Sequence, residues 1–96
     1  HMAFSKAHIF HENECTLAIL CKALSHPARI RILEILKQNG TTSAHDLFRE
    51  IPLARPTVSQ HLTILRKCGV VYYYEQFPTV LYSIDEKCEI FMERIR

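Results

Sequence analysis

Apolar residues recur with a helical spacing of three to four positions in five stretches of the chain. Pro27 and Pro56 suit the first turn of a helix, whereas Gly40 and Gly69 suit the position just after its end. Ser43 precedes a third stretch as a capping residue, with an acid three positions later. The predicted helices cover residues 7–24, 27–39, 44–51, 56–68 and 85–96.

Two further runs, residues 70–75 and 80–84, are rich in Val, Tyr, Leu and Ile and have the composition of β-strands. The residues between them, Gln-Phe-Pro-Thr at 76–79, predict a hairpin turn. Two short helices joined by a tight turn precede this hairpin and indicate a helix-turn-helix over about residues 43–68. The expected fold class is therefore mainly α with a small β-hairpin (α+β): a winged helix-turn-helix with its wing at about 70–84.

The first predicted helix carries two apolar stripes where a surface helix needs only one. One stripe contains Leu17, Leu20, Cys21 and Leu24, and the other contains Cys15, Ala18 and Ile19. The last predicted helix is also amphipathic. Because a chain of 96 residues buries only about two thirds of its unfolded surface, a second copy would stabilise it. We expect a homodimer that forms through the first and last helices.

Composition places the chain among ordinary globular domains, with 48% hydrophobic and 23% charged residues. We expect one domain over residues 3–96, with residues 1–2 left by an expression vector. No apolar run approaches the roughly 20 residues of a membrane span, so no membrane contact is expected. The 4 cysteines come without a secretory signal, which favours free thiols and a cytoplasmic location.

Two motifs carry a family resemblance. Residues 23–33 read ALSHPARIRIL, and residues 56–71 read PTVSQHLTILRKCGVV. Together, at this separation, they closely resemble the ArsR/SmtB family of bacterial repressors, and the resemblance extends over roughly residues 15–93. It implies a winged-helix regulator that binds double-stranded DNA as a dimer, with the second motif forming the recognition helix.

The recognition helix would turn Val58, Leu62 and Leu65 inward and present a polar arc outward. The segment 51–74 contains three basic residues and no acid, which makes it the best polyanion site in the chain. The candidate DNA-binding residues are Arg55, Pro56, Thr57, Ser59, Gln60, His61, Thr63, Arg66 and Lys67. His61 borders the buried stripe and could equally be a structural histidine.

The wing tip departs from the family pattern, which often has Arg or Lys there. Here the tip is Glu-Gln-Phe-Pro-Thr at 75–79, so we expect weak, apolar or absent wing contacts. The contacts with DNA phosphates would then come from the recognition helix, with Arg29 or Arg31 as further candidates. The tyrosines at 72–74 could offer hydroxyls to phosphates or simply pack the sheet.

The resemblance does not supply an effector. Metal sensors of this kind carry two thiolates on the third helix, where this chain has Ser43 and His45. Other members use histidines of the last helix, which has none here. No cofactor is therefore expected, and the remaining candidates for a divalent metal site are His8, His11, Cys15 and Cys88.

The same cysteines could respond to oxidants. We expect Cys15 or Cys88 to react in that case, because Cys21 and Cys68 are predicted to be buried. A metal- or thiol-responsive repressor thus stays open as an alternative, as does a winged helix that binds only proteins. Residues 11–15, His-Glu-Asn-Glu-Cys, narrowly miss a zinc-protease motif, and with no phosphate-binding glycine loop we expect no enzyme.

Overall fold

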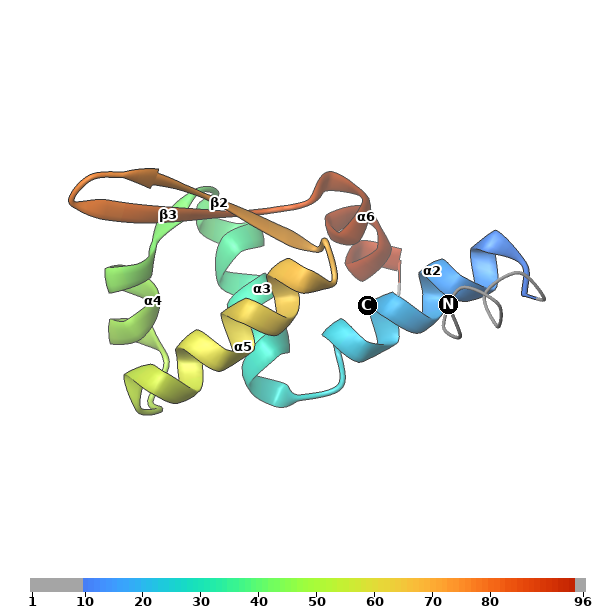
Figure 1. Ribbon diagram of the computed structural model, residues 1–96, viewed down its shortest axis with the longest axis horizontal. Coiled ribbons are helices and arrows are strands. Elements are labelled where there is room, and N and C mark those ends of the chain that lie inside the picture. Colours follow the sequence, from blue (N-terminus) through green and yellow to red (C-terminus); the bar gives the residue numbers. More distant parts are fainter. Residues whose placement is uncertain (1–9, 95–96) are drawn as a thin grey trace, which may run out of the picture.

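The computed structural model describes residues 10–94, which form five helices and a three-stranded antiparallel sheet (Figure 1). The elements are α2 (Glu12–Ala23), α3 (Pro27–Asn39), β1 (Thr42–Ser43), α4 (Ala44–Glu50), α5 (Arg55–Lys67), β2 (Val71–Gln76), β3 (Thr79–Ile84) and α6 (Glu86–Arg94). This order confirms the predicted winged helix-turn-helix, with α4 and α5 as its two helices and β2–β3 as its wing.

The core lies where α3, α4 and α5 meet the inner face of the sheet. Ile32, Leu33 and Leu36 of α3 are almost completely buried, and they pack with Leu47 of α4 and Leu65 of α5. These residues recur at helical spacing, so each helix presents one apolar face to the others. The core therefore fixes which face of α5 remains in solvent.

Local signals set the ends of these helices. The Nδ1 atom of His26 accepts a hydrogen bond from the Ala28 N–H (3.0 Å) and caps α3. The Ser43 hydroxyl accepts the Asp46 N–H (3.1 Å) and caps α4. Gly40 and Gly69 follow α3 and α5 with φ of 75° and 77°, a backbone region that favours glycine.

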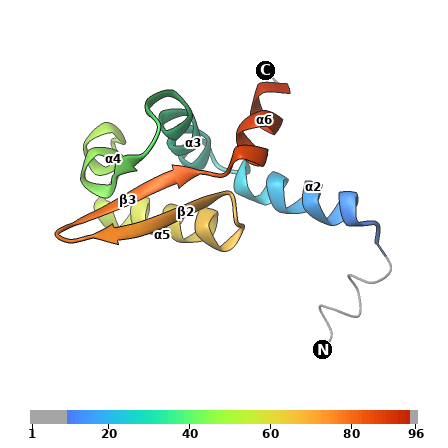
Figure 2. The ribbon, with the colours of Figure 1, turned by 90° about the horizontal axis from the view of Figure 1, so that it is seen from above.

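The sheet has the order β1-β3-β2, and the hairpin register runs from Val71↔Ile84 to Gln76↔Thr79. Only Phe77 and Pro78, joined by a cis peptide bond, form the turn. Seen from above, the hairpin extends past α5 at the end of the molecule away from α2 (Figure 2). The two-residue strand β1, which pairs with β3 and leads directly into α4, was not predicted.

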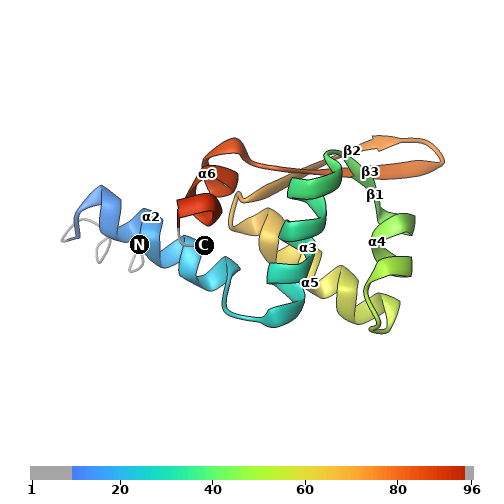
Figure 3. The same cartoon turned by 180° about the vertical axis from the view of Figure 1, so that it is seen from behind.

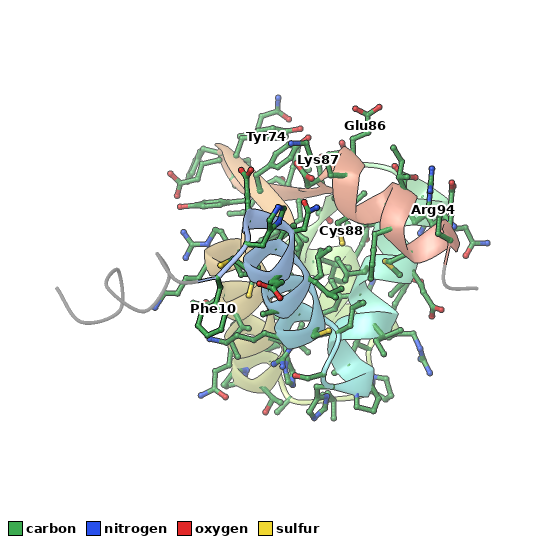
Figure 4. All side chains as sticks on the ribbon, turned by 90° about the vertical axis from the view of Figure 1, so that its right-hand side faces the viewer. Phe10, Tyr74, Glu86, Lys87, Cys88 and Arg94 are labelled. Atoms are coloured by element: carbon green, nitrogen blue, oxygen red, sulfur yellow. The ribbon has the colours of Figure 1, made fainter. Side chains whose placement is uncertain are left out.

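The helices α2 and α6 lie together at the other end of the molecule (Figures 1 and 3). α2 begins at Glu12 with His11 as its cap, and not at residue 7; residues 7–9 lie outside the described residues. In α2 only Ala23 is buried, and Cys21 is exposed, so its predicted place in the core is wrong. α6 is anchored by Cys88 and Met92, and Figure 4 shows Cys88 on its inner side.

Within residues 10–94, no helix is long and apolar enough to cross a membrane.

Candidate nucleic-acid interface

The outward face of α5 carries a row of polar side chains. Its exposed members are Arg55, Ser59, Gln60, Arg66 and Lys67, and Thr57 and Thr63 are half-buried. Pro56 is exposed beside them. Val58, Leu62 and Leu65 on the opposite face are at most 2% exposed. The structure thus brings most of the sequence-predicted set together on one surface. The Thr63 hydroxyl donates to the Ser59 carbonyl oxygen (3.0 Å), so its oxygen is left as an acceptor.

Charge on this surface is entirely positive. α5 contains no acidic residue, and its cations lie at its two ends: Arg55 at the N-terminus, Arg66 and Lys67 at the C-terminus. The N-terminal amides and the helix dipole add partial positive charge beside Arg55. This arrangement suits an extended polyanion that lies along the helix.

Both arginines of α5 lie over aromatic rings. The guanidinium carbon of Arg55 is 5.2 Å from the ring centroid of Phe48 in α4. That of Arg66 is 4.6 Å from the ring of Tyr73 in β2, which stacks in turn on Tyr82 in β3 (5.9 Å between centroids). The contact of Phe48 with Arg55 is not visible in the sequence, because only the tertiary packing of α4 against α5 brings this ring under the guanidinium.

His61 points into the protein, in contrast to the rest of the polar row. It is 9% exposed, and its ring lies 4.4 Å from that of His26. Its Nδ1 lies 3.3 Å from Nη1 of Arg29, which donates to it. Burial lowers the pKa of His61, and the positive charges of His26 and Arg29 lower it further. These contacts favour the structural interpretation of His61.

Arg29, one of the two further phosphate candidates, is 8% exposed, and this burial argues against a phosphate contact. Its Nε donates to the carbonyl oxygen of Ala23 (3.2 Å), and its Nη2 donates to that of Lys22 (3.0 Å) and to the Ser25 hydroxyl (2.6 Å). A cation at the C-terminus of α2 is favourable because the last carbonyls of a helix have no partner within it. Arg29 therefore joins α2 to α3 and to the buried side of α5.

The wing tip offers no positive charge. Glu75, Gln76 and Phe77 are exposed, Phe77 almost entirely (97%). Tyr72 and Tyr74 lie edge to face on the sheet with ring centroids 6.5 Å apart. These contacts agree with the interpretation that the tyrosines pack against their neighbours on the sheet.

The metal and thiol candidates do not form a site in the described part of the chain. His8 lies outside it, and the Nδ1 of His11 already accepts the Asn13 N–H (3.1 Å). Across residues 10–94 no three His, Cys, Asp or Glu side chains come together as metal ligands do.

The burial of the cysteines differs from the burial on which their expected reactivity rests. Cys88 is 1% exposed, and burial, followed by the nearby Asp85, raises the pKa of its thiol to about 11. Cys21 is exposed, while Cys15 and Cys68 are half-buried. Since the thiolate is the reactive form and must be accessible, we expect oxidants to reach Cys21 most easily and Cys88 least easily.

Comparisons with known proteins agree with this geometry. The profile of the bacterial regulatory protein, arsR family, matches residues 26–73. The HTH-type transcriptional regulator YgaV of Escherichia coli is 40% identical over 70 residues, which cover 73% of this chain and 71% of that protein. The biofilm growth-associated repressor of Agrobacterium fabrum is 36% identical over 70 residues, covering 73% and 59%.

The fold has solved counterparts. HlyU from Vibrio cholerae matches with a TM-score of 0.81 at 26% identity, over 90% of this chain and 94% of that one. The matched region spans only 55 to 61% of the length of four curated relatives. The profile match, the relatives and the arrangement of α4, α5 and the hairpin lead to one conclusion: the chain belongs to the arsR family of bacterial regulatory proteins and has the fold of a winged-helix transcriptional regulator.

Proposed function

We propose that this chain is a sequence-specific repressor that binds double-stranded DNA as a cytoplasmic homodimer, on a palindromic operator. The observation that carries the proposal is the acid-free polar face of α5 opposite its buried stripe. In a helix-turn-helix the second helix enters the major groove, and its N-terminal residues reach base edges. The Gln60 amide can pair with adenine through two hydrogen bonds, and Arg55 can pair with guanine or a phosphate.

Phosphate contacts would then come from the ends of α5. Arg66 and Lys67 are exposed at its C-terminus, and the hydroxyls of Thr57 and Ser59 lie nearer its N-terminus. Glu75 at the wing tip would face phosphates unfavourably, so the recognition helix carries the interaction.

The exposure of α2 in the single chain supports the homodimer. Only one of its 12 residues is buried, whereas Leu17 and Ile19 are 50% and 46% exposed. An isolated helix of this length is marginal in water, so α2 needs a surface to pack against. A pocket of about 230 Å³ along α2 is lined by Phe10, Glu14, Cys15 and Ala18, and it offers a recess for apolar side chains. A second copy supplies such side chains through a two-fold axis.

The proposal is tested with a duplex selected from a random library by the intact protein. We expect Gln60→Ala and Arg55→Ala each to weaken binding to this duplex by about 1–3 kcal/mol without changing the thermal unfolding midpoint. Gln38→Ala, an exposed glutamine of α3, is the matched control and should bind like the wild type. Undiminished binding by both α5 variants would refute the assignment of the recognition helix.

A further inference from the structure

We infer that Phe48 and Tyr73 are positioning residues for DNA binding, because each holds the guanidinium of an α5 arginine at one end of the recognition helix. The inference rests on the proposed function, and it adds two residues outside α5 to the recognition surface. Neither residue belongs to the polar row, and neither would touch the DNA bases itself.

We call each aromatic ring that lies under an α5 arginine a platform. The first platform, Phe48 of α4 under Arg55 of α5, links the two helices of the helix-turn-helix. Phe48 is half-buried, and the core residues that pack against its ring hold it in place. Arg55 is the first residue of α5, and its guanidinium lies over this ring at 5.2 Å. A contact of this kind occupies none of the five guanidinium N–H donors as a hydrogen bond would. Arg55 is therefore held in place while its donors remain free for a base or a phosphate.

The second platform joins the wing to the recognition helix. Arg66 lies 4.6 Å from the ring of Tyr73, which stacks on Tyr82 at an interplanar angle of 26°. Tyr73 and Tyr82 are paired residues of β2 and β3, so the sheet register fixes the stack. The wing thus contributes to recognition through its base, although its tip carries a glutamate.

The arginine–ring contacts matter because neither arginine has a carboxylate partner within residues 10–94. Among the described residues, neither Arg55 nor Arg66 forms an ion pair, and the acid-free α5 offers them no carboxylate. A carboxylate partner would have to be displaced before a phosphate could bind, whereas an aromatic ring need not be. An unrestrained arginine loses conformational entropy when DNA immobilises it, and this loss weakens binding. A ring that already restrains the side chain in the free protein makes the entropy loss smaller.

The test uses substitutions that keep a large apolar side chain but remove the aromatic ring. Phe48→Leu and Tyr73→Leu should each bind the selected duplex about two- to fivefold more weakly, as expected for an exposed cation–π contact. Phe48→Tyr and Tyr73→Phe keep the ring and should bind like the wild type. Tyr72→Leu, the neighbouring tyrosine of β2, lies under no arginine in the described residues and is the matched control. If Tyr73→Phe binds as weakly as Tyr73→Leu, the hydroxyl is the active group and the inference is wrong.

Double-mutant cycles separate positioning from packing. In an Arg55→Ala background Phe48→Leu should cause no further loss of affinity, and the same should hold for Tyr73→Leu in an Arg66→Ala background. If a leucine variant still loses affinity when its arginine is already absent, the ring supports DNA binding through the stability of the fold and not through the arginine. That result overturns the inference. If the arginine variants weaken binding but the leucine variants do not, the positioning role fails and the proposed function stands. If Arg55→Ala and Gln60→Ala both bind normally, the proposed function itself fails.

Discussion

Two exposed apolar side chains of α2, one from each of its two apolar stripes, allow a quantitative prediction for the dimer. Leu17 and Ile19 are 50% and 46% exposed in the protomer. Complete burial of such a side chain is worth about 1.5–3 kcal/mol, so covering the remaining half gives about 0.7–1.5 kcal/mol each. A symmetric dimer that covers both stripes buries four of these side chains, and Leu17→Ser combined with Ile19→Ser should then cost about 3–6 kcal/mol of association free energy.

The assay is sedimentation equilibrium over a concentration series. The double variant should have a dimer dissociation constant about 10²- to 10⁴-fold above that of the wild type. Leu53→Ser, a residue between α4 and α5 that is 42% exposed, controls for the loss of an exposed apolar side chain. A double variant that dimerises as tightly as the wild type, or a wild type that is monomeric at micromolar concentration, would refute the role of α2.

Two further predictions follow from buried groups. Because the pKa of His61 is lowered in the folded state, the unfolded chain takes up a proton near pH 6.5 that the folded one does not, so stability should fall as the pH drops below 6.5. Denaturant midpoints at pH 7.5 and 5.5 test this, and an equal pH dependence in His61→Gln would contradict it. In maleimide labelling of the native protein Cys21 should react first and Cys88 last, whereas fast labelling of Cys88 would contradict its burial.

Much of the fold could be predicted from local patterns. The boundaries of α3, α4 and α5 follow from residues that act within one turn, such as Pro27, Ser43 and Gly69. The hairpin follows from two β-rich runs close together in the chain. Strand β1 could not be predicted, because two residues are too few to show an alternation of apolar and polar positions and they pair with a strand far along the chain.

The errors concern features that depend on tertiary packing. The sequence predicts two apolar stripes on α2, but periodicity does not tell what covers a stripe, and Cys21, a predicted core residue, is exposed. The sequence leaves Arg29 as a further candidate for a phosphate contact, yet its guanidinium donates to the carbonyl oxygens at the end of α2 and is buried. Likewise, the platforms under Arg55 and Arg66 arise only when α4 and β2 pack beside α5.

Hydroxyl-radical footprinting of the intact protein on its selected operator decides whether two copies of this chain present two α5 helices to one DNA duplex. We expect two protected half-sites on the same side of the duplex, with centres about 34–36 Å apart, and Gln60→Ala should need a higher protein concentration to protect both. Protection of a single isolated half-site, or protection by Gln60→Ala at the same concentration as the wild type, would contradict this arrangement.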